Sequence, residues 1–217
     1  MLLYADIGNR LFNPLKELAP ERCINTGIAE AHMASMAAGL AMSGFHPLMF
    51  TITPFTTSRN FEQIKIDIAY QNLPVVIAGT GSGLGYANLG PTHHSFEDIA
   101  LMRSLPNMTV VCPADSNELK ALLPQAIESS GPVYFRMGKK NEPIITEGEL
   151  KLEIGKAHVL QPGNEVLILA NGLITAEAQQ VCSTLKAEYQ LTPELVSFHT
   201  VKPLDTAYLK EAAKRFS

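Results

Sequence analysis

Short apolar runs alternate with helix-like stretches along the first two thirds of the chain. Each run is apolar at consecutive positions, which is typical of parallel strands covered by helices on both faces. The runs predict strands at residues 2–5, 22–24, 47–50, 74–78, 109–112 and 133–135. The patterns between them predict helices at 28–42, 57–70, 96–103 and 116–128. This alternation predicts an α/β fold with a doubly wound, mostly parallel sheet over residues 1–140.

A second domain follows a change in composition. Residues 141–154 are polar and punctuated by Gly and Pro, which predicts a linker. Beyond it the pattern predicts strands at 166–170 and 195–198 and helices at 174–189 and 206–216. We therefore expect a second α/β domain at 155–217. Two strand–helix units are few for an independent core, so we expect this domain to be incomplete in the sequence given.

Two helix starts carry capping signals. Thr26 precedes the helix predicted at 28–42, where its hydroxyl can accept a bond from a free backbone N–H. Asp115 and Glu118 form an Asp-x-x-Glu capping signal at the start of the helix predicted at 116–128. Pro124 lies inside that helix and has no N–H to donate, so it should kink the helix or cut it short.

Composition restricts the class of protein. The net charge is -4, the charged fraction 18% and the hydrophobic fraction 46%, which predicts a soluble globular protein with no electrostatic attraction for nucleic acid. No apolar run approaches the roughly 18–20 residues of a membrane span. The N-terminus lacks the pattern of a signal peptide. Cys23, Cys112 and Cys182 are far apart in apolar contexts, so we expect a cytoplasmic protein with buried thiols.

Glu30 stands out because it begins a helix made of small residues. The stretch 29–41 is mostly Ala, Met, Ser and Gly, which predicts close packing on several sides. A carboxylate there is costly to ionise unless another group holds it. We therefore expect a buried, partly protonated acid with a catalytic role. The alternative is a glutamate that only stabilises the N-terminus of the helix.

A glycine-rich stretch at 79–85 follows the fourth predicted strand. A phosphate-binding loop would open a helix, but more loop follows here, so we expect an irregular backbone that lines a cavity. His93 and His94 lie in the same loop and could be metal ligands, proton shuttles or surface residues. Because adjacent side chains point apart, a single functional His is the interpretation that we favour.

Other residues with useful chemistry also follow predicted strands. Phe55 and Phe61 are either core residues or a flat aromatic surface for a ring ligand. Arg136 could cap a neighbouring helix or bind an anion such as phosphate. Asp6 follows the first strand in the same way. Since the carboxyl ends of parallel strands meet at one edge, these residues and Glu30 should converge on one functional site.

These residues, taken in order, resemble the transketolase family. Residues 1–138 resemble the pyrimidine-binding domain of that family. The related 1-deoxyxylulose-5-phosphate synthases share this domain. Residues 150–217 resemble the start of its C-terminal domain. The segments that carry the resemblance are INTGIAEAHMASMAAGL at 24–40, Pro54-Phe55 leading into Gln63-Ile64, Gly90-Pro91-Thr92-His93 and Pro106-Asn107-Met108.

The resemblance implies thiamine diphosphate as the cofactor. Glu30 matches the glutamate of the family that hydrogen-bonds N1′ of the aminopyrimidine ring and favours its imino form, which makes it catalytic. Phe55 matches the aromatic residue that stacks on this ring, and Phe61 a second aromatic position of the same pocket. Asp6 matches an acidic residue near the cofactor.

The resemblance also implies substrate contacts, with departures. His93 matches the catalytic His of the GPTH motif that contacts substrate, and Arg136 the arginine that holds a sugar phosphate. Leu89 replaces the acidic residue that usually precedes GPTH, and Gly81 stands where many transketolases carry a second substrate His. A less hydroxylated or non-pentose substrate is therefore compatible with this sequence. Ala31 replaces a common Gln or His, which we expect to be tolerated.

The diphosphate- and magnesium-binding domain of the family, with its GDG…N motif, is absent from this sequence. We expect a separate N-terminal subunit to hold the diphosphate and Mg²⁺, as in split transketolases, unless the chain is a fragment. Because a cofactor site at a subunit junction leaves apolar surface on a monomer, we expect at least a dimer, either a homodimer or a heterotetramer.

The expected function is the C-terminal subunit of a transketolase-like transferase that moves a two-carbon ketol unit between sugar phosphates. Two alternatives stay open. The first is another thiamine enzyme, either a decarboxylating synthase like 1-deoxyxylulose-5-phosphate synthase or the β subunit of an oxoacid dehydrogenase. The second is a non-catalytic assembly partner that keeps the fold.

Overall fold

The computed structural model describes residues 1–8 and 10–216, which divide into two compact units. The first unit contains residues 1–110 and 126–140, and the second contains 111–125 together with the chain from 141 onward. The segment 111–125 thus groups with the second unit, although the sequence pattern placed it before the boundary at 140.

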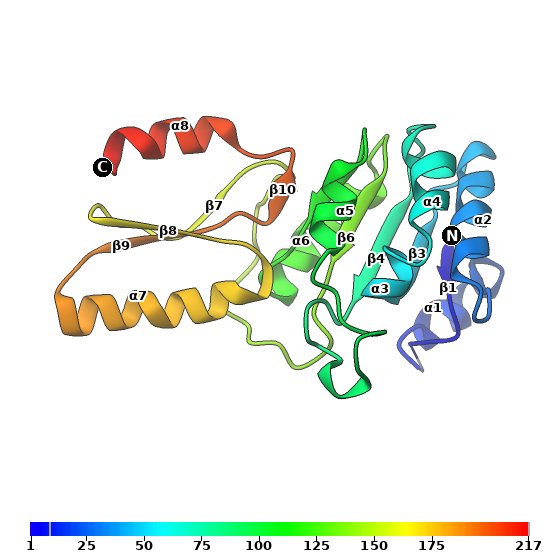
Figure 1. The fold of residues 1–217 in the computed structure, drawn as a ribbon, viewed down its shortest axis with the longest axis horizontal. Helices are drawn as coiled ribbons and strands as arrows, with labels where there is room; N and C mark the ends of the chain where they lie inside the picture. Colours follow the sequence, from blue (N-terminus) through cyan, green and yellow to red (C-terminus); the bar gives the residue numbers. More distant parts are fainter. Residues whose placement is uncertain (9, 217) are drawn as a thin grey trace. The chain divides into compact units, whose positions relative to one another are not determined.

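A parallel sheet forms the centre of the first unit (Figure 1). Its strands lie in the order β5-β6-β4-β3-β1-β2. Strand β1 pairs in parallel with β2 and β3, β3 with β4, and β4 with β6. This confirms the predicted doubly wound parallel sheet. The strands are β1 (Leu2–Tyr4), β2 (Cys23–Asn25), β3 (Leu48–Ile52), β4 (Val76–Thr80), β5 (Thr109–Val111) and β6 (Val133–Arg136).

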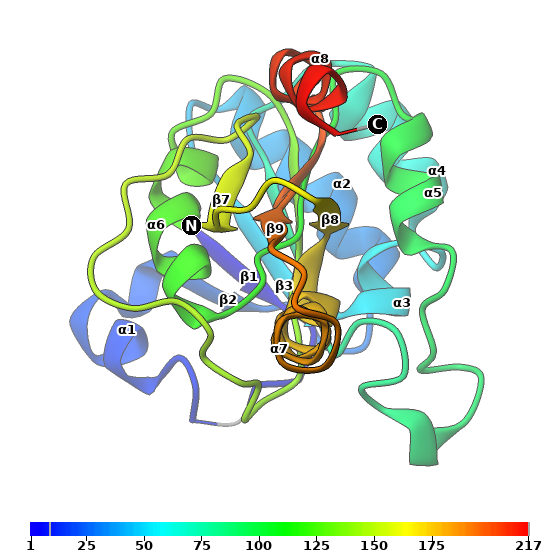
Figure 2. The ribbon, with the colours of Figure 1, turned by 90° about the vertical axis from the view of Figure 1, so that its left-hand side faces the viewer.

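Helices cover both faces of this sheet, as consecutive apolar positions in its strands require. Figure 2 shows α2, α4 and α5 on one face and α1 on the other. The sequence pattern did not predict α1. The helical elements are α1 (Asn13–Leu18), α2 (Glu30–Met42), α3 (Thr53–Thr56), α4 (Phe61–Gln63), α5 (Asp98–Ser104), the π-helix η2 (Ile64–Ala69) and the 3-10 helices η1 (Pro20–Arg22) and η3 (Ala87–Leu89).

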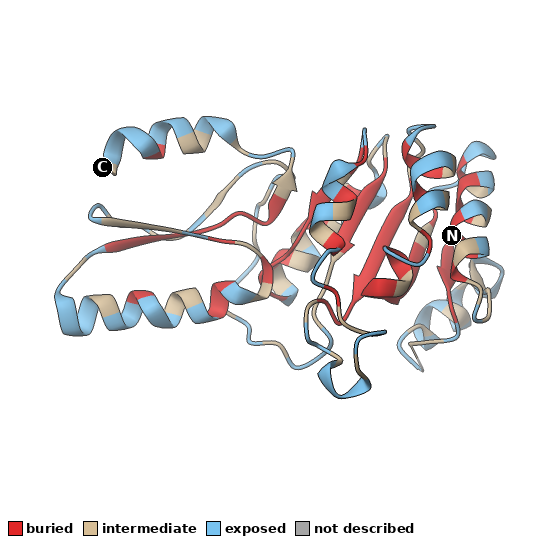
Figure 3. Cartoon of the chain, in the orientation of Figure 1, coloured by how far each residue is buried: buried red, intermediate tan, exposed pale blue. Residues whose placement is uncertain are grey.

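The core of the first unit lies along β1, β3, β4 and β6, which are almost entirely buried (Figure 3), whereas β2 at the edge of the sheet is only partly buried. Met33 of α2 and Ile64 of η2 are fully buried with strand residues such as Met49. A second cluster contains Tyr4 and Phe50, and the ring of Phe12 packs against both, with centroids 5.5 Å and 5.0 Å away. Burial on both faces of the strands explains why they carry no alternating polar positions.

The helix predicted at 57–70 begins late, because residues 57–60 form a turn and the helical residues run from Phe61 to Ala69. Helix α3 begins earlier, at Thr53, and is followed by a turn over 57–60 before α4 and η2. The hydroxyls of Thr56 and Thr57 both donate to the backbone oxygen of Thr53, at 3.0 Å and 2.7 Å. The buried Asn60 side chain donates to the backbone oxygen of Glu30 at 3.3 Å. These side-chain bonds compete with a continuous helix, and apolar periodicity does not reveal them.

The helix-end predictions have mixed outcomes. The prediction that Thr26 caps α2 is wrong, because its hydroxyl donates to the backbone oxygen of Tyr4 and the residue before α2 is Ala29. The cap predicted at Asp115 is confirmed, since its Oδ1 accepts from the backbone N–H of residue 118 at 2.9 Å. Helix α6 (Ser116–Ile127) runs through Pro124, so the expectation that this proline cuts it short is wrong.

The second unit has a three-stranded sheet in the order β7-β9-β8. Strands β8 and β9 are parallel, whereas β7, which the pattern did not predict, is antiparallel to β9. Helices α7 and α8 lie on opposite faces of this sheet (Figures 1 and 2). The elements are β7 (His158–Gln161), β8 (Val166–Ala170), η4 (Gly172–Ile174), α7 (Thr175–Tyr189), β9 (Pro193–Ser197), β10 (Thr200–Lys202) and α8 (Thr206–Arg215).

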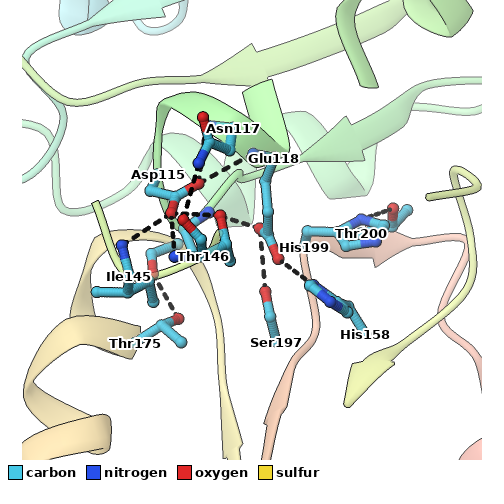
Figure 4. Close-up of polar contacts among 12 residues, drawn as sticks. Asp115, Asn117, Glu118, Ile145, Thr146, His158, Thr175, Ser197, His199 and Thr200 are labelled. Carbon is cyan, nitrogen blue, oxygen red and sulfur yellow. Dashed lines mark hydrogen bonds and ion pairs between the residues drawn. The ribbon is translucent and has the colours of Figure 1, made fainter. Parts of the chain in front are cut away.

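A buried polar network lies inside the second unit (Figure 4). The fully buried Glu118 carboxylate accepts hydrogen bonds from the backbone N–H of Ala114, the hydroxyl of Ser197 and Nδ1 of His158. Asp115 accepts from the backbone and hydroxyl of Thr146, in the stretch predicted as a linker. That stretch is therefore anchored to the segment before α6 rather than solvated along its length.

Two further expectations can be compared with the described residues. No helix among them is both long and apolar enough to cross a membrane. Cys112 and Cys182 are buried, as expected, while Cys23 is half-buried.

Candidate active site

The predicted site residues meet at the carboxyl edge of the parallel sheet. Asp6 follows β1, Glu30 begins α2 shortly after β2, and Phe55 lies in α3 directly after β3. His93 lies in the loop that follows β4, and Arg136 is the last residue of β6. The parallel register of these strands places all their carboxyl ends on the same side of the sheet. The predicted common edge is confirmed, and the convergence of these residues on one functional site stays a prediction.

Glu30 is buried, with 4% of its surface exposed. Small residues of α2 such as Ala34 and Ala37 are also buried, which lets the neighbouring elements pack closely around the start of the helix. The amide of Asn60 holds the Glu30 backbone from the turn before α4. The predicted burial of this carboxylate is therefore correct.

Glu30 has a basic partner in its own chain, which the sequence reasoning missed. Arg59 Nη1 lies 3.1 Å from Glu30 Oε1, and the Arg59 side chain is 43% exposed. Glu30 therefore forms an ion pair with a side chain 29 residues further along the chain. The expectation of a partly protonated acid stays a prediction.

Arg59 also contacts Phe55. Its Cζ lies 3.9 Å from the centroid of the Phe55 ring, within cation–π range. One guanidinium therefore touches both the buried carboxylate and the aromatic ring. The predicted acid and the predicted aromatic surface lie within the span of a single small planar group.

His93 packs against the same aromatic ring. The ring centroids of Phe55 and His93 are 5.1 Å apart, in an edge-to-face arrangement. His94 diverges from it, since its Nε2 lies 3.1 Å from the backbone oxygen of Ala87. Among the described residues no group of three or more His, Cys, Asp or Glu side chains is placed to hold a metal ion. His93 is therefore the histidine that joins the Glu30–Arg59–Phe55 group.

The glycine-rich loop is irregular, as expected, and a tyrosine fills part of it. Gly81 has a φ of +70°, and a Cβ placed on it would lie 2.0 Å from the Tyr86 ring. Tyr86 lies 6.0 Å from His93 between ring centroids, and Lys139 Nζ lies 4.3 Å from the Tyr86 centroid. Burial raises the pKa of the Tyr86 phenol. The Tyr86 ring thus fills the space next to Gly81.

Arg136 is held by a buried acid. Its Nε lies 2.7 Å from Asp98 Oδ2, which also accepts from the hydroxyl of Tyr134 at 2.7 Å. Asp98 is 1% exposed, and the Arg136 side chain is 17% exposed. This arrangement fixes the direction of the guanidinium beside the glycine-rich loop, where Gly83 is its neighbour.

The contacts described above among Glu30, Arg59, Phe55 and His93 do not include Asp6 or Phe61. Asp6 is exposed and exchanges hydrogen bonds with Asn25 across the ends of β1 and β2. Phe61 is half-buried at the start of α4, and the ring pairs found among the described residues do not include it. A hollow of about 350 Å³ lies beside Asp6, lined by Tyr4, Asp6, Ile7, Gly8, Arg10, Lys16 and Asn25.

Three residues of this site were not singled out by the sequence reasoning: Arg59, Tyr86 and Asp98. Each lies within five residues of one that was, which is the only signal that could have suggested it. Their roles depend on contacts between segments, such as the contact between Glu30 and Arg59, which are 29 residues apart in the sequence. The pattern of a single sequence does not contain that information.

Comparisons with known proteins point to one family. Residues 6–143 match the family model "Transketolase, pyrimidine binding domain", and residues 155–217 match "Transketolase, C-terminal domain". The chain is 38% identical over 196 residues to the 6-deoxy-6-sulfo-D-fructose transketolase subunit SqwH of Clostridium sp. (strain MSTE9), a match that covers 90% of this chain and 61% of that protein.

Two further matches are informative. The chain is 37% identical over 200 residues to the 1-deoxy-D-xylulose-5-phosphate synthase of Microcystis aeruginosa, covering 90% of this chain and 31% of that enzyme. A solved structure described as "Split gene transketolase, inactive beta4 tetramer" superposes with a TM-score of 0.90 at 36% identity, covering 100% of this chain and 70% of that one.

The chain thus spans less than two thirds of the length of these two curated relatives. The matched domains cover the site described above, including Glu30, Phe55, His93 and Arg136. The expected resemblance is confirmed: this chain belongs to the transketolase family.

Proposed function

We propose that this chain is the pyrimidine-domain, C-terminal subunit of a thiamine-diphosphate-dependent transketolase. It acts as a transferase that moves a two-carbon ketol unit between sugar phosphates. One observation carries the proposal: the buried Glu30 carboxylate and the Phe55 ring lie within the span of one planar group. An aminopyrimidine ring needs such a pair, a carboxyl group for a ring nitrogen and a flat face for stacking.

The residues present fit such a ring. The guanidinium of Arg59 is planar and carries N–H groups, and it already bridges the carboxylate and the aromatic ring. Asn60 Oδ1 is buried next to this group without a hydrogen-bond partner among the described residues, so an acceptor is available there. Glu30 would hold the proton at the ring nitrogen, while Phe55 and His93 would orient the ring.

Thiamine diphosphate, when bound, supplies the carbon that accepts and releases the two-carbon unit. The contribution of this chain is to hold the ring and exclude water from Glu30. His93 is the proposed contact to substrate and Arg136 the proposed contact to a sugar phosphate, with Asp98 directing the guanidinium. Asp6 and Phe61 remain proposed neighbours of the cofactor.

A separate diphosphate-binding N-terminal subunit completes the site in this proposal. It would hold the diphosphate and Mg²⁺, and the assembly would be a cytoplasmic homodimer or heterotetramer. The relatives named as transketolase subunits support a split enzyme. The similarity to a protein described as an inactive beta4 tetramer supports self-association of this chain without activity.

The substrate is expected to differ from the common pentose phosphates. Leu89 is exposed at the position that usually carries an acid before GPTH, and Tyr86 occupies the space at Gly81. The acid and the second histidine that many transketolases place at these two positions are therefore not available to hydrogen-bond hydroxyls of the substrate. The relative that acts, by its name, on 6-deoxy-6-sulfo-D-fructose supports a modified sugar as substrate.

The test is reconstitution with a purified diphosphate-domain subunit of a split transketolase, comparing wild type with Glu30→Gln. We expect ketol transfer that needs both chains and that falls about 10²- to 10⁴-fold in Glu30→Gln, the range of general acid–base contributions. Ser35→Ala, in the same helix but in contact with Asp67, is the matched control and should keep activity. Full activity of Glu30→Gln would reject the role of this residue.

The match to 1-deoxy-D-xylulose-5-phosphate synthase favours one alternative, a decarboxylating synthase. Pyruvate as donor separates the two reactions, because a transketolase releases no carbon dioxide. Release of carbon dioxide from pyruvate by the reconstituted enzyme would support the synthase, and its absence together with ketol transfer would support the transketolase.

A further inference from the structure

Arg59 contacts the two groups that the proposed function assigns to the pyrimidine ring. Its Nη1 lies 3.1 Å from Glu30 Oε1, and its Cζ lies 3.9 Å from the Phe55 centroid. A guanidinium and an aminopyrimidine share the relevant features: both are flat, both carry N–H groups that can face a carboxylate, and both stack on aromatic rings. A ring that stacked on this face of Phe55 and faced this oxygen would overlap Arg59.

The arginine is the member of this group that can move. Glu30 is buried at the start of α2, with its backbone held by the amide of Asn60. Phe55 lies in α3 and packs against His93. The Arg59 side chain is 43% exposed and follows the short α3 in the turn over 57–60. It can therefore turn into water without disturbing the core, while the carboxylate stays in place.

We propose that Arg59 competes with the cofactor ring for Glu30 and Phe55. This inference rests on the proposed function. Arg59 neutralises the buried carboxylate when no ring faces it, and it must leave both contacts when a ring binds. Breaking the ion pair and the cation–π contact costs free energy, so Arg59 lowers the affinity of the enzyme for the cofactor. Arg59 is in this sense a positioning residue rather than a catalytic one.

The competition makes a prediction opposite to that for a residue that helps to hold the cofactor. Arg59→Met keeps the length of the side chain but removes its charge and its N–H groups. A partly exposed ion pair and a cation–π contact together correspond to about a tenfold change in affinity. We expect thiamine diphosphate to bind about tenfold more tightly to the enzyme reconstituted with Arg59→Met, with Arg59→Lys between this variant and wild type.

A matched control is available in the same chain. Arg22 lies 3.8 Å from the Glu21 carboxylate and 5.8 Å from the Phe45 centroid, so it also meets an acid and an aromatic ring. Arg22→Met should leave the affinity for thiamine diphosphate unchanged. The titration uses thiamine diphosphate with Mg²⁺ and is read by calorimetry, so it does not depend on catalytic activity.

A second measurement tests the Arg59–Glu30 contact in this chain alone. Urea unfolding of wild type, Arg59→Met, Glu30→Gln and the double variant forms a double-mutant cycle. We expect Arg59→Met to lower the urea midpoint in the wild-type background and to have a much smaller effect in the Glu30→Gln background. Equal effects in both backgrounds would overturn the pairing on which the competition depends.

The outcomes separate this inference from the proposed function. Tighter binding to Arg59→Met, with Arg22→Met unchanged, supports the competition. Weaker or equal binding to Arg59→Met, with wild type binding normally, overturns the competition and leaves the proposed function intact. Binding to none of the proteins, with the coupling between Arg59 and Glu30 still present in the unfolding cycle, overturns the proposed function and the competition with it.

Discussion

The Asp98 carboxylate joins Arg136 to Tyr134, because its Oδ2 accepts from Arg136 Nε and from the Tyr134 hydroxyl, each at 2.7 Å. Asp98 is the first residue of α5, and the other two residues lie on β6. A buried acid at a helix N-terminus that meets a guanidinium and a phenol is well satisfied. The proposed phosphate-binding arginine is therefore held in one direction by an element distant in sequence.

Asp98→Asn should weaken this arrangement. The amide keeps the size of the side chain but removes the charge that Arg136 faces inside the protein, so we expect a loss of about 1–3 kcal/mol in the free energy of unfolding. Urea denaturation measures it. Tyr134→Phe, which removes one hydrogen bond to the same oxygen, should cost about 1 kcal/mol. An Asp98→Asn variant as stable as wild type would show that the ion pair contributes nothing to stability.

Gly81→Ala should destabilise the glycine-rich loop more than Gly83→Ala. Both glycines have positive φ, +70° and +64°, so both substitutions carry a backbone cost of about 1–2 kcal/mol. At Gly81 the new Cβ would also lie 2.0 Å from the Tyr86 ring, whereas at Gly83 the nearest atom is 3.9 Å away. Thermal unfolding of the two variants measures the difference, and Tyr86→Ala should remove most of it. Equal losses for both variants would contradict the clash.

Glu194 should make stability depend on pH in the acid range. Hydrogen bonds from Arg215 lower the pKa of the Glu194 carboxyl from 4.5 to about 2, against the effect of burial. Because the folded state binds this proton less readily than the unfolded state, the stabilisation is present above about 4.5 and is lost as the pH falls towards 2. Urea midpoints from pH 6 to about pH 2.5 should fall less steeply in Glu194→Gln than in wild type. Parallel curves would contradict this prediction.

His199 should add a second pH dependence, near neutrality. It is fully buried, and burial lowers the pKa of its imidazole below 6.5; the nearby Glu118 carboxylate opposes this effect and His158 adds to it. The unfolded state therefore binds the proton more readily, so the free energy of unfolding should fall as the pH drops below about 6.5. His199→Asn should flatten the curve between pH 7 and pH 5.5. An unchanged slope in this variant would assign the dependence to other groups.

The sequence was sufficient for the architecture of the first unit and for the edge of the sheet at which the candidate residues lie. Consecutive apolar positions in short runs require burial on both faces, and helices between such runs leave a parallel sheet as the solution. Parallel strands bring their carboxyl ends to one edge, so Glu30, Phe55 and Arg136 could be placed there from their positions after the strands. The small residues of α2 predicted the burial of Glu30, because small side chains let neighbouring elements pack closely around the helix.

Side-chain hydrogen bonds limited the helix predictions. The helix predicted at 57–70 begins only at Phe61, after the residues where Thr56 and Thr57 bond back to Thr53 and where Asn60 bonds to the backbone of Glu30. The hydroxyl of Thr26 could cap α2, but in the fold it is closer to the backbone oxygen of Tyr4. Each of these polar groups has several possible partners of similar energy, and only the folded chain selects among them.

The amino-acid sequence by itself determined the order of the elements, the edge of the sheet at which the candidate residues lie and the family to which the chain belongs. The tertiary structure alone decided which side chains meet: Arg59 pairs with Glu30, Asp98 pairs with Arg136, and Tyr86 fills the space next to Gly81. The physical reason is the separation in sequence over which each signal acts. Apolar periodicity is a local property that repeats within each element, whereas an ion pair or a ring contact depends on where two distant segments come to lie.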